Sequence, residues 1–161
     1  MKIYVAGSWK NRKDIKLTWI EPLIKLGHEI THDWTEMEDE RLDEIGHPLR
    51  DIDYHKMCAQ SDVNGVINAD VLIVVMDSAV KHYSYRGTWT EIGVAIGKSL
   101  TSGKDMPIIL YNPWIDDEDI NEMAKYSRNV TNVFFWHDKI TRVTTGNAVF
   151  RELKKLENSQ K

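Results

Sequence analysis

The chain has 161 residues, a formal net charge of −4 and a hydrophobic share of 42%, values that suit one compact domain and exclude a disordered chain. Its single cysteine, Cys58, excludes an internal disulfide and a cysteine-based zinc cluster, so we expect a reducing, cytoplasmic compartment. The longest apolar run, residues 71–76, is too short to span a membrane, and no basic stripe indicates a nucleic-acid partner.

Apolar runs alternate with stretches of helical periodicity from one end of the chain to the other. Residues 3–6 predict a strand that ends at Gly7, and apolar residues then recur at helical spacing between positions 15 and 24. Gly27 is expected to end that helix, and Pro22 to kink or restart it. Further strands are predicted at 28–34, 71–76, 107–110 and 130–136, further helices at 51–68, 88–100 and 144–156, and a charged surface loop at 36–49.

Five strands interleaved with helices predict one α/β domain, a three-layer αβα fold in which helices cover both faces of a parallel sheet. The continuous apolar run 71–76 is typical of a strand buried on both faces. We expect the domain to span residues 1–161, with a flexible tail at 157–161. The helix at 51–68 is expected to bury one apolar face, made of Ile52, Ala59, Val63, Val66 and Ile67.

Ligands of such sheets bind beyond the carboxyl ends of the strands, near the point where the strand order reverses. The segments predicted at that edge are Gly7-Ser8-Trp9, Asp33-Trp34, Asp77-Ser78 and the loop at Gly87.

The segment His28-Glu29-Ile30-Thr31-His32 matches the zinc-protease pattern H-E-x-x-H. That motif requires a helix, which brings both imidazoles to one metal ion. Here the segment follows a helix-ending glycine and is predicted as a strand, in which residues four apart are separated by roughly 13 Å. We therefore predict that it binds no metal.

The turn after the first strand, Gly7-Ser8-Trp9-Lys10-Asn11-Arg12, has two interpretations. Its backbone N–H groups and basic side chains could bind a small anion, or it could be an ordinary tight turn. It lacks the spacing of a dinucleotide or triphosphate motif, so no nucleotide cofactor is expected. Trp9 favours a ligand site, because a large aromatic side chain at a strand end can stack on a flat ligand.

Two carboxylates are candidates for chemistry, and each also has a structural interpretation. Asp62 lies near the edge of the expected apolar face of its helix, where an ordinary solvated residue is favoured. Glu91 and Thr88 match the S/T-x-x-E capping box, and the spacing alone favours this structural interpretation of Glu91 over a functional one. In the functional interpretation Glu91 faces the ligand edge, is kept ionised by the helix N-terminus and acts as a nucleophile, while neighbouring glycines let a sugar approach.

Taken together, a series of segments resembles the nucleoside 2-deoxyribosyltransferase family over roughly the first two thirds of the chain. These segments are Lys2-Ile3-Tyr4-Val5-Ala6-Gly7-Ser8-Trp9, Gly27-His28-Glu29-Ile30-Thr31-His32-Asp33-Trp34-Thr35, Ser61-Asp62-Val63-Asn64-Gly65-Val66, Ala69-Asp70-Val71-Leu72 and Arg86-Gly87-Thr88-Trp89-Thr90-Glu91-Ile92-Gly93.

The resemblance implies a flavodoxin-like, doubly wound five-stranded sheet and covalent glycosyl transfer. By their match to the family's motifs, Glu91 is the nucleophile that attacks C1′ of a 2′-deoxynucleoside, and Asp62 is the acid/base group beside the nucleobase. Tyr4 matches the tyrosine that hydrogen-bonds the nucleophile. The substrate-binding residues implied at the same edge are Gly7, Ser8, Trp9, Trp34, Tyr85, Arg86 and Gly87.

The implied activity is exchange of nucleobases between 2′-deoxynucleosides, without metal or other cofactor. One departure concerns the 5′ end of the substrate: Tyr85 stands where the family often has Asp, or Ser in its nucleotide-cleaving relatives. With Lys10, Arg12 and Arg86 nearby, hydrolysis of deoxynucleoside 5′-monophosphates is an alternative, and a catalytically silent nucleotide-binding module is another.

The resemblance further implies a homodimer or higher homo-oligomer in which subunits share active sites. Asn129 or Asn132 is a candidate to reach across that interface.

Overall fold

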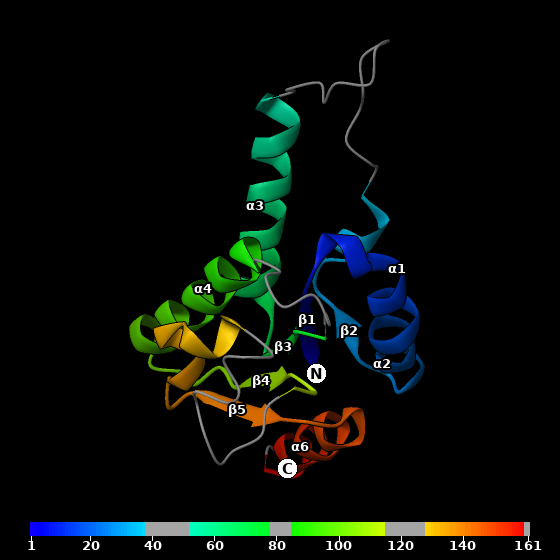
Figure 1. Ribbon diagram of the computed structural model, residues 1–161, viewed down its shortest axis with the longest axis vertical. Coiled ribbons are helices and arrows are strands. Elements are labelled where there is room, and N and C mark those ends of the chain that lie inside the picture. Colours follow the sequence, from blue (N-terminus) through cyan, green and yellow to red (C-terminus); the bar gives the residue numbers. More distant parts are fainter. Residues whose placement is uncertain (38–51, 78–84, 115–127, 160–161) are drawn as a thin grey trace.

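The computed structural model describes residues 1–37, 52–77, 85–114 and 128–159 (Figure 1). Its centre is a five-stranded parallel sheet with the strand order β2-β1-β3-β4-β5. The strands are β1 (Lys2–Ala6), β2 (Glu29–Ile30), β3 (Val71–Val75), β4 (Ile108–Tyr111) and β5 (Ile140–Val143). This order is that of the flavodoxin-like doubly wound fold, as expected, and it reverses between β1 and β3.

Helices cover both faces of the sheet (Figure 1). One layer holds α1 (Arg12–Ile15), α2 (Glu21–Lys25) and α6 (Gly146–Ser159), and the other holds α3 (Ile52–Asn68) and α4 (Arg86–Ser102). Within the first layer, Trp19 stacks on Phe150 of α6 with the ring centroids 6.0 Å apart. Because both faces are covered, all five residues of β3 are buried. None of the helices in the described ranges has the length and apolar character that crossing a bilayer requires.

The first helical stretch restarts at its proline, as predicted. A π-helical turn (Lys16–Ile20) separates α1 from α2; it ends with the Glu21 N–H donating to the Lys16 carbonyl oxygen, and Pro22 lies in the first turn of α2. Gly27 follows with a φ of 86°, a left-handed conformation that glycine adopts readily.

The prediction of a fifth strand at 130–136 is wrong. This segment forms two 3₁₀ turns, Arg128–Thr131 and Val133–Trp136, and the strand comes later, at β5. Asn132 caps the second turn, accepting a hydrogen bond from the backbone N–H of Phe134 at 2.9 Å. Val133 is 79% exposed and Phe134 45% exposed, so this apolar run is not a buried strand of the sheet.

The second strand is much shorter than the predicted 28–34. Only Glu29–Ile30 pairs with β1, and the chain then turns into a 3₁₀ helix, Trp34–Glu36. The Asp33 carboxylate caps that helix by accepting a hydrogen bond from the backbone N–H of Thr35 at 3.1 Å. The turn directs Trp34 back over the end of β1. Most of the predicted loop at 36–49 lies outside the described residues.

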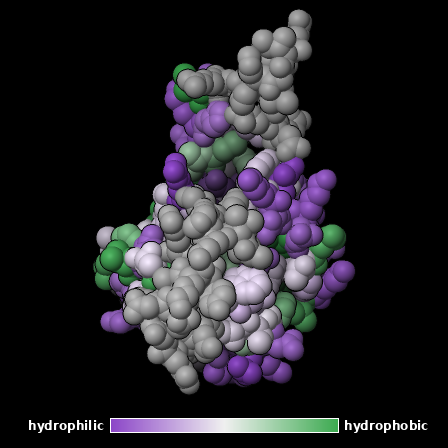
Figure 2. Space-filling model, viewed as in Figure 1, coloured by the Kyte–Doolittle hydropathy of each residue, from purple (hydrophilic) through white to green (hydrophobic). Residues whose placement is uncertain are grey.

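The expected apolar face of α3 is also wrong. Ile52 is 67% exposed and Ile67 46% exposed, and Val66 is the buried member of the predicted set. The face turned inward instead carries Cys58, Asp62 and Gly65. On the side shown in Figure 2, hydrophobic residues lie in separate groups, one of them toward the projecting end of α3. The helix therefore turns a partly polar face toward the body of the domain and leaves an apolar stripe outside.

Candidate active site

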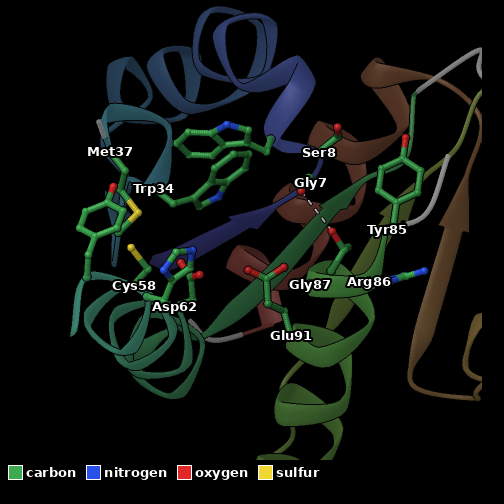
Figure 3. A pocket seen from close by; sticks show the side chains of 14 residues that line it. Gly7, Ser8, Trp34, Met37, Cys58, Asp62, Tyr85, Arg86, Gly87 and Glu91 are labelled. Atoms are coloured by element: carbon green, nitrogen blue, oxygen red, sulfur yellow. Dashed lines mark hydrogen bonds between the residues drawn. The ribbon is translucent and has the colours of Figure 1, made fainter. Parts of the chain in front are cut away.

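A cavity of about 410 Å³ opens at the carboxyl end of β1, between α3 and the start of α4 (Figure 3). This volume lies in the range of small-molecule sites, and the position is the one expected at the reversal of strand order. The cavity is lined by Gly7, Ser8, Trp9, Trp34, Met37, Tyr54, His55, Cys58, Asp62, Tyr85, Arg86, Gly87, Thr88 and Glu91.

Two carboxylates in this cavity share one phenol. The hydroxyl of Tyr4 lies 2.6 Å from Glu91 Oε1 and 3.0 Å from Asp62 Oδ1. Tyr4 is completely buried in β1, whereas Asp62 comes from α3 and Glu91 from α4. Figure 3 shows the two carboxylates pointing toward each other across the cavity. Three elements far apart in the sequence thus bring their polar groups to one point.

The number of protons limits how Tyr4, Asp62 and Glu91 can hydrogen-bond to one another. A phenol has one O–H and can donate it to one acceptor at a time. Both short contacts of the Tyr4 oxygen are therefore satisfied together when one carboxyl is protonated and donates to that oxygen. The cluster is best satisfied when Asp62 and Glu91 share a single proton.

The surroundings raise the pKa values of all three groups. Burial raises the pKa of Glu91 to about 7, against the hydrogen bond from Tyr4, and the nearby Asp62 charge adds to the rise. Burial also raises the pKa of Asp62, opposed by Tyr4 and by His32. Burial and the two carboxylates raise the pKa of Tyr4 far above its usual value, so it remains a neutral phenol.

The structure does not support the expectation that the helix N-terminus keeps Glu91 ionised. Helix α4 begins at Arg86, two residues before the predicted start, which makes Glu91 its sixth residue. The field of a helix end falls off beyond the first turn. The capping box is not formed either, because the Thr88 hydroxyl donates to the Gly7 carbonyl oxygen at 3.2 Å and Glu91 bonds to Tyr4.

The close approach of α3 to the sheet depends on Gly65. A Cβ at this position would lie 2.7 Å from the Tyr4 ring and 2.8 Å from the Cβ of His32. The Gly65 carbonyl also accepts a hydrogen bond from the Thr31 hydroxyl at 2.8 Å. Because Asp62 lies one helical turn before Gly65, this contact brings its carboxylate within reach of Tyr4.

Two tryptophans form an aromatic wall of the cavity. Trp34 is nearly buried and donates its indole N–H to the Val5 carbonyl oxygen at 2.6 Å, which fixes its ring. Trp9 is 39% exposed, with its ring centroid 6.3 Å from that of Trp34 and the Arg12 guanidinium 4.4 Å above it. The wall gives the cavity a large apolar surface that suits a flat ligand.

The turn after β1 has clear structural causes. A Cβ at Gly7 would lie 2.5 Å from Ile15 Cδ1, so a larger residue would force that side chain to move. Ser8 caps the following 3₁₀ turn (Trp9–Asn11), accepting a hydrogen bond from the Lys10 backbone N–H at 3.2 Å. Neither Lys10 nor Arg12 belongs to the cavity lining. These features agree with the tight-turn interpretation, and anion binding here stays a prediction.

The structure brings together the site residues singled out from the sequence. All the predicted substrate-binding residues, with Asp62 and Glu91, line the cavity, while Tyr4 lies beneath it. Their roles toward a ligand stay predictions. Sequence reasoning missed five lining residues: Met37, Tyr54, His55, Cys58 and Thr88. The spacing of residues 55, 58 and 62 along one helical face was the signal that could have revealed three members of this wall.

The H-E-x-x-H segment contains β2 (Glu29–Ile30), with one histidine before and one after the strand, and the two histidines face different partners. His28 Nε2 lies 3.8 Å from Glu157 of α6, and His32 Nε2 lies 3.5 Å from Asp62. Within the described ranges, no three His, Cys, Asp or Glu side chains are grouped so that they could hold a metal ion.

Comparison with known proteins gives a limited result. No family model and no curated protein matches this chain. Among solved structures, the CMP N-glycosidase BcmB from Clostridium botulinum is similar over 96% of this chain and 99% of that chain, with 16% sequence identity and a TM-score of 0.44.

We expect Glu91→Gln to stabilise the protein at alkaline pH and not at acid pH. Because the folded-state pKa is raised from 4.5 to about 7, the native state binds more protons than the unfolded state in this window, and stability falls as pH rises through it. The gain at pH 8 should be up to about 3 kcal/mol. Urea unfolding at pH 4 and pH 8 measures it, with Glu29→Gln on exposed β2 as control; an equal change at both pH values would contradict the shift.

We expect Gly65→Ala to destabilise the protein by about 1–3 kcal/mol, because the new methyl group overlaps Tyr4 and His32. The matched control is Gly97→Ala in α4, where a Cβ meets nothing within 4 Å and the change should stabilise the helix. Thermal unfolding of both variants is the measurement. If both alanines raise the melting temperature, the close packing at Gly65 is refuted.

Proposed function

We propose that the protein is a nucleoside 2-deoxyribosyltransferase: an enzyme that breaks the N-glycosidic bond of a 2′-deoxynucleoside and moves the deoxyribosyl group to another nucleobase. Glu91 is the nucleophile, Asp62 the general acid/base and Tyr4 the group that orients both. No cofactor takes part in this reaction.

The observation that carries the proposal is the phenol shared by the two carboxylates. Since both oxygens bond to the Tyr4 hydroxyl, they can be no further apart than the two hydrogen bonds laid end to end, about 5.6 Å. Glycosidases that form a covalent intermediate keep their carboxyl groups roughly 5–5.5 Å apart, whereas those that activate a water directly need about 6.5–9.5 Å. The bound applies to the two oxygens that face Tyr4, and their closeness supports a nucleophile and an acid that act on the same glycosidic carbon, as a double displacement with net retention requires.

In the first half-reaction, ionised Glu91 attacks C1′ while Asp62 is protonated. The bond from C1′ to a Glu91 oxygen forms as the bond from C1′ to the base nitrogen breaks, and the Asp62 proton goes to the departing base. A base anion would be a poor leaving group without that proton. Absence of the electron-withdrawing 2′-hydroxyl eases the development of positive charge at C1′, which favours deoxynucleosides.

In the second half-reaction, a new base attacks C1′ of the glycosyl ester. Its N–H proton goes to Asp62, the ester bond to Glu91 breaks, and the carboxylate is restored. Tyr4 keeps its proton throughout, because its pKa is raised far above the usual range. The single proton that the carboxyl pair shares is thus passed to one base and taken back from the next.

The walls of the cavity fit the two halves of a nucleoside. The aromatic wall of Trp9 and Trp34 suits a flat base on the Asp62 side. Gly87 lines the cavity with open space where a side chain would be, so a sugar can come close to the start of α4. The resemblance of the motif series to the deoxyribosyltransferase family agrees with this assignment.

One observation favours a second candidate, hydrolysis of deoxynucleoside 5′-monophosphates. Arg86 lines the cavity at the start of α4, where a cation could bind a 5′-phosphate. In Figure 3 its side chain points away from Glu91. Of the three cations considered from the sequence, Lys10 and Arg12 lie outside the lining, which weakens this alternative.

The exposed stripe on α3 supports the expected homo-oligomer. Ile52, Val63 and Ile67 are apolar, at helical spacing and open to solvent in the single chain. A second copy of the protein would bury them next to the wall of the cavity that α3 provides. Of the two candidates to reach across, Asn132 caps its own 3₁₀ turn through Phe134.

We expect the wild-type protein, given one deoxynucleoside and a different free base, to produce the exchanged deoxynucleoside and a covalent adduct of one deoxyribosyl group at Glu91. Chromatography measures the exchange, and mass spectrometry of peptides measures the adduct. Glu91→Ala should lose both and stay folded. Free base with deoxyribose 5-phosphate from a monophosphate would indicate the hydrolase; ligand binding without turnover, unchanged by Glu91→Ala, would indicate a silent binding module.

We expect a bell-shaped pH profile of kcat/KM with its alkaline limb near pH 7. The reaction needs the one proton that Asp62 and Glu91 share, and the two carboxyl groups lose that proton as the pH rises through the pKa of about 7. In Asp62→Asn that proton and the Asp62 charge are gone. The rate should then be far lower and rise with pH to a plateau as Glu91 ionises, at a pKa below that of the wild type. A variant that keeps the alkaline limb would contradict the role of Asp62.

A further inference from the structure

We propose that His32 is a positioning residue for Asp62: its imidazole holds the Asp62 carboxylate against Tyr4 and limits the second protonation of the carboxyl pair. This inference rests on the proposed function and extends it beyond the three catalytic groups. It also gives a role to one histidine of the H-E-x-x-H segment, which binds no metal in our interpretation.

The geometry places His32 and Tyr4 on the same oxygen atom. Asp62 Oδ1 lies 3.0 Å from the Tyr4 hydroxyl and 3.5 Å from His32 Nε2. The Nε2 atom is buried and makes no hydrogen bond with any described residue. A buried nitrogen without a partner is costly, and a shift of a few tenths of an ångström would complete its bond to Asp62. The carboxylate oxygen therefore lies between a phenol and an imidazole, and it can accept a hydrogen bond from each of them.

The surrounding fold holds this arrangement in place. His32 follows β2 directly after Thr31, whose hydroxyl donates to the Gly65 carbonyl oxygen at 2.8 Å. A Cβ at Gly65 would touch both Tyr4 and the Cβ of His32, so α3 presses on the two residues at once. Asp62 lies one turn earlier on the same helix. The contact between His32 and Asp62 thus follows from the packing of α3 against β1 and β2.

The charges that face Asp62 come from each element around it. Tyr4 approaches from β1, Glu91 from α4 and His32 from the end of β2. Along α3 itself, His55 and Cys58 line the same cavity, and Arg86 lines it at the start of α4. Tyr4 and His32 both lie within 3.5 Å of Asp62 Oδ1; Tyr4 stays a neutral phenol, whereas a protonated His32 brings a positive charge to this oxygen.

This charge matters in both half-reactions. When His32 is protonated it disfavours a second proton on the pair, so Glu91 remains available as a nucleophile at lower pH. When His32 is neutral with its proton on Nε2, it still orients Asp62 toward the base. After the deoxyribosyl ester forms, Glu91 carries no charge, and His32 and Tyr4 hold the ionised Asp62 ready to take a proton.

The experiment compares His32→Ala and His32→Gln with His28→Gln, each in the full chain. His28 is a matched control, since it flanks the same strand and pairs with Glu157 of α6 outside the cavity. We expect His32→Ala to lower kcat by about 10–100-fold with KM changed less than about twofold. His32→Gln should recover most of kcat, because its amide N–H reaches the position of Nε2.

The pH profile distinguishes the effect of the His32 charge from the effect of its hydrogen-bonding N–H. In His32→Gln the acid limb of kcat/KM should move up by about half a pH unit or more, since the imidazolium no longer opposes protonation of the pair. His28→Gln should keep the wild-type rate and profile. Wild-type kcat and an unmoved acid limb in both His32 variants would overturn the inference.

A titration of the Asp62 side-chain carboxyl by ¹³C NMR in the ligand-free protein needs no turnover. Loss of His32 should raise the pKa of Asp62, because His32 opposes the rise that burial causes. A protein that catalyses nothing would refute the proposed function, while this titration still decides on His32. An Asp62 titration identical in wild type and His32→Gln would refute the inference even if the enzyme is active.

Discussion

The structure depends on one buried hydroxyl placed between two acids. Tyr4 lies in the fully covered strand β1, so its oxygen cannot move away from Glu91 and Asp62, and water cannot easily replace either partner. A phenol with one proton facing two carboxyl groups favours a singly protonated pair. Burial raises the pKa of Glu91, and the nearby Asp62 charge adds to the rise, while the shared phenol holds an oxygen of each acid close to one point, as the proposed glycosyl transfer requires.

The elements packed around Tyr4 bring Asp62 and Glu91 to its hydroxyl. The strand order reverses beside β1, which opens the sheet edge where α4 presents Glu91. Gly65 lets α3 come close enough to present Asp62. The same helix keeps an apolar stripe outside, so its two sides serve different purposes: one forms the cavity wall and the other suits contact with a second subunit. Burial of the Glu91 carboxylate lowers the stability of the folded protein at neutral and alkaline pH, where the proposed reaction uses its charge.

The order and type of most elements could be predicted because apolar runs and helical spacing alternate clearly, as at residues 71–76 and 88–100. The fifth strand was misplaced because 130–136 is more apolar than the true edge strand, β5, which carries Arg142 and buries Ile140 alone among its apolar residues. Glu91 and Asp62 could be named from the motif series. Their raised pKa values could not, since these arise from burial in the folded protein, against the hydrogen bonds from Tyr4, and for Glu91 also from the nearby Asp62 charge. His32 was not identified as a site residue, because it belongs to an H-E-x-x-H segment, a pattern typical of zinc proteases.

The most direct measurement is a crystal structure after soaking with a 2′-deoxy-2′-fluoroarabino nucleoside, whose fluorine slows release of a glycosyl ester by opposing positive charge at C1′. The account predicts continuous density between Glu91 Oε and C1′, with Asp62 facing the vacated base position and Tyr4 still bonded to both acids. Density that joins C1′ to any other side chain, or a bound intact nucleoside whose C1′ faces away from Glu91, would contradict it.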